Sequence, residues 1–121
     1  MAMNTRQSGN DGEDFACAYI QEQGMKVIAR NYRFGREEID IIAQDGDIIA
    51  FVEVKARQSE AKGRPEEAVT RQKRRSIIYA ATGYLKKNNL LESRIRFDVA
   101  AICGREIKYI KAAFDSTGAT I

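Results

Sequence analysis

The sequence predicts an α/β fold in which a mixed β-sheet is flanked by helices and the elements follow the order αβββαββ. Two observations support this class. Segments rich in β-branched and apolar residues recur between turn residues, and one long amphipathic segment separates the third of them from the fourth. A helix in that position crosses over the sheet and sets its two neighbouring strands in parallel, which makes the sheet mixed.

The first half of the chain is expected to hold one helix and three strands. Asn10 or Asp11 can cap a helix over about 12–23, and Gly24 is a natural end for it. Asp45–Gly46 is a favoured pair for a two-residue hairpin turn between the second and third strands. The three strands are expected at 25–34, 37–43 and 47–56.

The second half is expected to hold the other helix and two strands. The polar segment 58–64 is expected to be a surface loop. Pro65 suits the first turn of a long helix over about 65–88, whose apolar side is formed by residues at helical spacing. The last two strands are expected at 96–102 and 106–114.

Length and composition limit the possible functions. With 121 residues, 44% hydrophobic and 31% charged, the chain fits one domain at 11–121, preceded by a polar, aperiodic segment at 1–10 that is expected to be a flexible tail. The absence of histidine excludes His-based zinc sites and catalytic triads. A net charge of +3 is compatible with a polyanionic partner.

Two further features concern the compartment. Cys17 and Cys103 lack metal-ligand spacing, and we interpret them as reduced core residues, with a disulfide or metal role as the alternative. No apolar run is long enough to span a membrane, and no lipidation motif is present. We therefore expect a cytoplasmic protein without a membrane partner.

Charged residues interrupt the otherwise apolar hairpin at 37–57. Alternate residues of a strand share one face, so a turn at Asp45–Gly46 decides which side chains meet. One face is then apolar throughout. Asp40, Glu53 and Lys55 gather at the far end of the other face, with Asp40 diagonally across from Glu53 at a distance that one cation can bridge.

This cluster predicts a metal site. Two carboxylates on a half-buried face are costly unless they form ion pairs or bind a cation. Mg²⁺ or Mn²⁺ would accept Asp40 and Glu53 as oxygen ligands, leaving Lys55 to orient or deprotonate an attacking water. The alternative is a solvated strand end with a Glu53–Lys55 ion pair, because the bare pattern E-x-K is common.

The segment RQKRR at 71–75 predicts contacts with nucleic acid. Its four cations lie within about one and a half helical turns, so some of them can face phosphates. Cations in the preceding loop can close over a duplex, and the small number of aromatic residues favours backbone contacts over base readout. A merely solvated helix face is the alternative. The candidate cations are Arg57, Lys62, Arg64, Arg71, Lys73, Arg74 and Arg75.

Asp40 followed by Glu53-x-Lys55 on the next strand resembles the core of the PD-(D/E)XK nuclease superfamily. The wider run, which includes GEDFACAYI, EEIDIIA, FVEVKAR and GRPEEAVTRQKRRSI, is similar to the YraN-like family of small bacterial proteins over about 12–102. That family is grouped by fold with archaeal Holliday junction resolvases and tRNA endonuclease-like domains. The resemblance implies a restriction endonuclease-like core.

Position by position, the resemblance implies that Asp40 and Glu53 are metal ligands and that Lys55 is the base that orients water. It adds Glu13, whose alternative role is a helix N-terminal carboxylate stabilised by the helix dipole. It also adds Gln72, which with Lys73 falls in the family's motif and would contact the nucleic acid backbone. Two positions depart from the pattern without removing a ligand: Glu37 replaces a glycine, and Ile39 replaces the proline of the superfamily's name.

The function expected from these features is a Mg²⁺- or Mn²⁺-dependent endonuclease that hydrolyses phosphodiester bonds in DNA, favoured over RNA, and in particular in branched or structured DNA. Cutting a duplex needs two active sites, which a homodimer would supply. The alternative is a module on the same fold that binds nucleic acid or another protein without turnover. Asp98 is expected to pair with Arg96 or Arg94 rather than to join the catalytic set.

Overall fold

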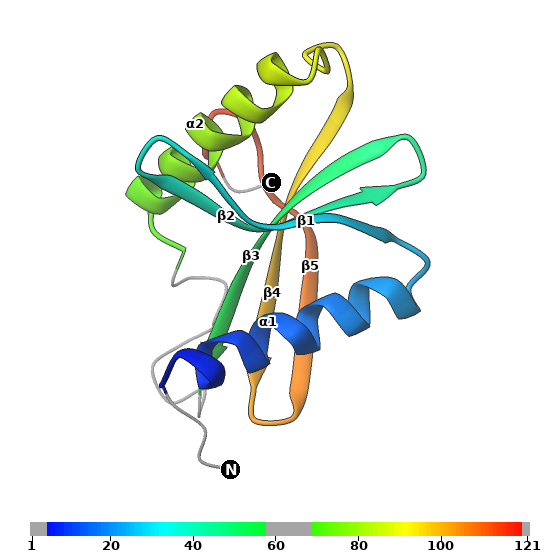
Figure 1. Cartoon of the computed structure of the whole chain (residues 1–121), viewed down its shortest axis with the longest axis vertical. Coiled ribbons are helices and arrows are strands. Elements are labelled where there is room, and N and C mark those ends of the chain that lie inside the picture. The colour runs from blue at the N-terminus through cyan, green and yellow to red at the C-terminus, as the bar shows by residue number, and fades with distance from the viewer. Residues whose placement is uncertain (1–4, 58–68, 120–121) are drawn as a thin grey trace.

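A computed structural model describes residues 5–57 and 69–119, which form one five-stranded sheet and two helices (Figure 1). The strands lie in sequence order across the sheet. β3 and β4 are parallel and every other neighbouring pair is antiparallel, so the predicted αβββαββ order and mixed sheet are confirmed. The elements are α1 (Thr5–Glu22), β1 (Lys26–Phe34), β2 (Glu37–Asp45), β3 (Ile48–Arg57), α2 (Arg71–Lys87), β4 (Arg94–Cys103) and β5 (Glu106–Phe114).

Both helices begin elsewhere than expected. α1 starts at Thr5, so residues 5–10, expected to belong to a tail, are helical. α2 starts at Arg71 because Thr70 is extended, with φ −66° and ψ 163°, and its hydroxyl accepts the Lys73 N–H at 3.1 Å as an N-cap. Pro65, where this helix was expected to begin, and the predicted loop at 58–64 lie outside the described residues.

The β2–β3 hairpin turns one residue later than expected. Asp45 pairs with Ile48, so the turn residues are Gly46 and Asp47. Gly46 has φ 63°, the left-handed conformation that the first position of such a turn requires and that glycine adopts without strain. The register therefore shifts by two residues. The side chains of the paired residues 41–45 and 48–52 keep their expected faces, and the position of Asp40 comes level with Glu53 rather than diagonal to it.

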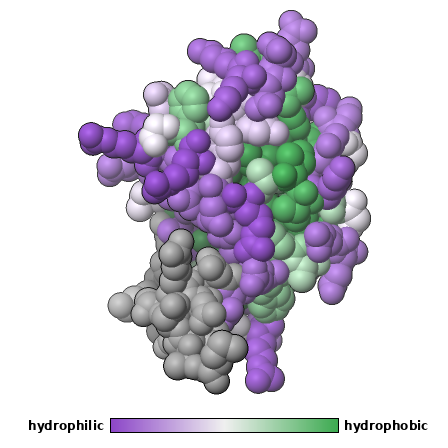
Figure 2. All heavy atoms as spheres, viewed as in Figure 1, coloured by the Kyte–Doolittle hydropathy of each residue, from purple (hydrophilic) through white to green (hydrophobic). Residues whose placement is uncertain are grey.

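The helices pack on opposite faces of the sheet, each over its own apolar cluster, with Phe51 and Phe97 central to the α2 side and Ile20 and Val52 to the α1 side. Ile39 belongs to the α2 side, although alternation along β2 predicts the α1 side for it. Figure 2 shows a hydrophobic area on an otherwise largely hydrophilic view.

A buried aspartate ties β4 to β5. The Asp98 side chain is fully buried, and its carboxylate accepts hydrogen bonds from the Arg96 guanidinium at 2.8 and 3.0 Å, the Tyr109 hydroxyl at 2.7 Å and the Ala112 N–H at 2.9 Å. Burial and the Asp98 carboxylate raise the pKa of Tyr109. The predicted pairing of Asp98 with Arg96 is confirmed, and the satisfied network gives it a structural role.

Candidate active site

The candidate site lies where the sheet opens between β2 and β3. Their pairing ends at Ile41 and Val52, although β2 continues to pair with β1 and β3 continues to pair with β4. Figure 1 shows the two strands diverging beyond this point. Inside the opening, Asp40 Oδ2 accepts the Val54 N–H at 2.8 Å, so a side chain replaces the backbone carbonyl that a continuous sheet would supply. This bond fixes the Asp40 carboxylate at the mouth of the opening.

Glu53 projects into the same opening from β3. Its side chain is only 4% exposed, and Oε2 lies 3.7 Å from the ammonium groups of both Lys55 and Lys73. Oε1 is buried without a hydrogen-bond partner among the described residues. Burial and the neighbouring Asp40 carboxylate raise the pKa of Glu53 to about 8, against the opposing attraction of the two lysines. The site therefore holds a buried carboxylate with one unused oxygen.

The contact of Lys73 with the candidate site was not predicted from the sequence. Lys73 was expected to contact phosphate from α2, yet its ammonium reaches Glu53 on β3. The reason lies in the β3–α2–β4 crossover, since the helix that follows a strand in such a unit starts near the carboxyl end of that strand. From that rule, a contact between Lys73 and Glu53 could have been predicted. The side chain remains 38% exposed, so it can also face a ligand from solution.

Glu13 lies next to the opening but is engaged by β1. The Arg30 Nε donates to its Oε1 at 2.9 Å and the Asn31 Nδ2 donates to the same oxygen at 3.0 Å. Asn31 has φ 52°, and the β1–β2 register places it across from Asp40. Within residues 5–57 and 69–119, no group of three acidic, histidine or cysteine side chains is placed to hold a metal. The catalytic role of Glu13 remains a prediction.

The cations of the 71–75 segment have different surroundings. Arg71, Gln72 and Arg75 are exposed, as phosphate contacts would require. Arg74 turns back onto the protein: its Nε donates to the Val69 carbonyl and its Nη1 to the Gly118 carbonyl, each at 3.0 Å. Arg57 ends β3, but its side chain, like Lys62 and Arg64, falls outside what the structure describes.

The residues present fit a hard divalent cation. Carboxylate oxygens are the ligands that Mg²⁺ and Mn²⁺ prefer, and Mg²⁺ is often held by one or two carboxylates with water and substrate phosphate completing its shell. Asp40 and Glu53 supply such a pair, and the buried Glu53 Oε1 is an oxygen that a cation would satisfy. A two-carboxylate site leaves room for water and phosphate among the ligands.

The fold and the paired carboxylates at the sheet opening define an α/β protein with a restriction endonuclease-like core. The chain belongs to the family described as "Uncharacterised protein family UPF0102", which it matches over residues 12–102, and the YraN-like resemblance is thereby confirmed. No helix in the described parts of the chain is long and apolar enough to cross a membrane.

Similar curated proteins come from several bacteria, and each is called a UPF0102 protein. The one from Chlorobaculum parvum is 46% identical over 116 residues, which covers 88% of this chain and 90% of that protein. The one from Lachnoclostridium phytofermentans is 47% identical over 117 residues, with 96% and 99% covered. The one from Persephonella marina is 41% identical over 107 residues, with 88% and 92% covered.

Proposed function

We propose that the protein is a Mg²⁺- or Mn²⁺-dependent endonuclease that hydrolyses phosphodiester bonds in DNA, with branched or structured DNA as its substrate. One observation carries the proposal: Glu53 is buried beside Asp40 with an oxygen that no described donor satisfies. An unsatisfied buried carboxylate is costly, and a protein retains one where a ligand completes it. The exposed cations at the start of α2 supply an approach for phosphate.

Each residue of the opening has a role in this reaction. Asp40, held by the Val54 N–H, and Glu53 would hold the cation. A divalent cation in this position supplies a Lewis acid that lowers the pKa of water and neutralises charge on the phosphate. Lys55 orients the attacking water by hydrogen bonding from its ammonium group. With a cation on Glu53, Lys73 would be free to contact a phosphate oxygen of the substrate.

Calorimetry with Mn²⁺ tests the metal site directly. Wild type should release or absorb binding heat, and Asp40→Asn and Glu53→Gln should not. Glu92→Gln is the matched control, since Glu92 is an exposed carboxylate outside the site. Equal binding by wild type and Asp40→Asn would remove the basis of the proposal.

Cleavage is tested with labelled linear, forked and four-way DNA and with structured RNA in Mn²⁺. Wild type should cut structured DNA, while Glu53→Gln should bind the same substrates without cutting them. Lys73→Ala should weaken binding uniformly and reduce the salt slope by about one, as expected for a lost phosphate contact. A Lys73→Ala variant with the wild-type salt slope would show that Lys73 serves only Glu53.

A binding module without turnover is the second candidate. It is favoured by the two lysines beside Glu53, whose attraction opposes the rise in its pKa without a cation. DNA binding by wild type without metal binding or cleavage would select this candidate. In either case the unpaired Cys17 and Cys103 suit the reducing cytoplasm.

A further inference from the structure

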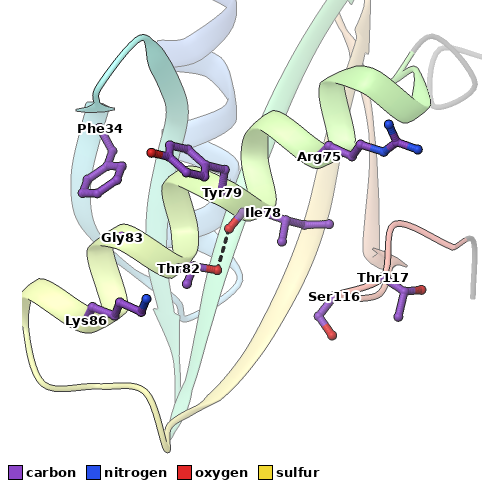
Figure 3. A pocket seen from close by; sticks show the side chains of 9 residues that line it. All are labelled: Phe34, Arg75, Ile78, Tyr79, Thr82, Gly83, Lys86, Ser116 and Thr117. Atoms are coloured by element: carbon purple, nitrogen blue, oxygen red, sulfur yellow. Dashed lines mark hydrogen bonds between the residues drawn. The ribbon is translucent and has the colours of Figure 1, made fainter.

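The outer side of α2 carries a groove that shares only Arg75 with the residues of the proposed reaction. Its volume is about 520 Å³, within the ~300–1,000 Å³ typical of ligand sites. Figure 3 shows Phe34 and Tyr79 side by side along one border, with Arg75 and Lys86 towards opposite ends of the helix. Ser116 and Thr117, which follow β5, lie on the other side of α2. The remaining lining residues are Ile78, Thr82 and Gly83.

The aromatic border combines an exposed Tyr79 with a half-buried Phe34. Tyr79 is 59% exposed. Its ring contacts that of Phe34 edge-on, with ring centroids 5.5 Å apart and ring planes at 63°. Phe34 packs directly onto the helix backbone, because a Cβ on Gly83 would lie 2.5 Å from its ring. An exposed aromatic side chain held in this way offers a flat apolar surface to a planar ligand.

The charge of the groove is positive. None of its lining residues is acidic, and Arg75 and Lys86 form no ion pair with any residue that the structure describes. A smaller cavity of about 160 Å³ shares Arg75 and Thr117 with the groove and adds Arg71. Cations and hydroxyl groups beside an aromatic surface match the chemistry of a nucleotide, which combines an anionic phosphate with a planar base.

The groove and the candidate active site both use side chains of α2. Lys73 faces Glu53, and Tyr79 lies six residues later on the same helix, at a rise of ~9 Å along the axis. Arg75 lies between these positions and Arg71 precedes Lys73 at the start of the helix, and both arginines are exposed. A strand that leaves the active site can therefore follow cations to the aromatic border within a few nucleotides.

We infer that this groove binds an unpaired nucleotide of the substrate, with the base on Tyr79 and Phe34 and the phosphates on Arg75 and Arg71. The inference rests on the proposed function and names its substrate class: DNA in which a duplex meets a single strand. The duplex lies at the sheet opening and the single-stranded arm runs over the outer side of α2. The alternative ligand of the groove is a peptide.

Fluorescence anisotropy tests whether the groove binds a single-stranded arm. The measurement is made in EDTA, so that the probes are not cut while binding is measured. The probes are a labelled blunt duplex and the same duplex with a single-stranded thymidine tail. Wild type should bind the tailed probe at least about fivefold more tightly, the lower limit expected for one stacked base. Tyr79→Ala should lose this preference and keep the blunt-duplex affinity, and Tyr79→Phe should retain the preference.

Leu91→Ala is the matched control, since Leu91 is 57% exposed and lies outside the groove. Equal affinity of wild type for both probes would overturn the inference. So would a Tyr79→Ala protein that keeps the full preference for the tailed probe, or a Leu91→Ala protein that loses this preference. Competition by a glutamate peptide as strong as by a thymidine oligonucleotide of matched charge would assign the groove to peptides and overturn it too. Loss of Mn²⁺ binding or cleavage with an intact tail preference would count against the proposed function alone.

Discussion

Replacing Glu53 with glutamine should stabilise the metal-free protein at pH 8 and change little at pH 5. Burial and Asp40 raise the pKa of Glu53 from 4.5 to about 8 in the folded state. Between these two values the unfolded chain has released the proton, whereas the folded protein still binds it. The free energy of unfolding of wild type therefore falls as pH rises through this interval.

The magnitude follows from the size of the interval. At 1.36 kcal/mol per pKa unit, a rise from 4.5 to about 8 corresponds to a loss that approaches about 5 kcal/mol above pH 8. Glutamine keeps the shape of the protonated side chain and does not titrate, so Glu53→Gln avoids this loss. The difference is large because Glu53 is only 4% exposed and water screens it poorly.

Urea unfolding in EDTA at a series of pH values measures the effect, with Glu92→Gln as the exposed control. The curves of wild type and Glu53→Gln should converge near pH 5 and separate towards pH 8. In a second series at pH 8 without EDTA, saturating Mn²⁺ should stabilise wild type, by about 2.7 kcal/mol at a concentration 100 times the Kd, and leave Glu53→Gln unchanged. Parallel pH profiles for the two proteins would contradict the assigned burial and charge of Glu53.

Three further contacts can be tested by substitution. Asp40→Asn should lose Mn²⁺ binding but stay within about 1 kcal/mol of wild-type stability, because an amide oxygen can still accept the backbone N–H of β3. Gly83→Ala should lower stability in thermal unfolding by about 1–3 kcal/mol, since its Cβ would overlap the Phe34 ring, and Phe34→Leu should relieve part of that cost. Tyr109→Phe should lower it by about 1–3 kcal/mol by removing a donor from the buried Asp98, with no effect on Mn²⁺ binding.

The element order was predictable from the sequence, and so were the faces of the hairpin except at Ile39, which lies on the α2 side. Alternation along a strand depends on parity, so a turn misplaced by one residue shifted the pairing by two and left Asp40 and Glu53 on a common side. The helix starts were less predictable. Pro65 is a good first-turn residue, yet Thr70 has the cap geometry, and a local pattern does not decide between two acceptable starts.

The site was predictable only in part, because its remaining contacts join distant segments. The spacing of Asp40 and Glu53 is visible in the sequence, whereas the contact from Lys73 depends on how α2 crosses the sheet. The Asn31 contact with Glu13 depends on a left-handed residue within β1, which no periodic pattern indicates. The groove over α2 likewise combines β1, α2 and the segment after β5.

The hydrogen bond between Val54 and Asp40 gives the protein an internal spectroscopic probe. The Val54 amide nitrogen lies 2.8 Å from Oδ2 of Asp40, a carboxylate that is expected to coordinate the cation. Its chemical shift in a ¹⁵N-resolved spectrum should move when that oxygen changes its electron density, without any label or substitution. The same amide has no second strand to protect it at this position, so its solvent exchange rate should report how often the opening widens.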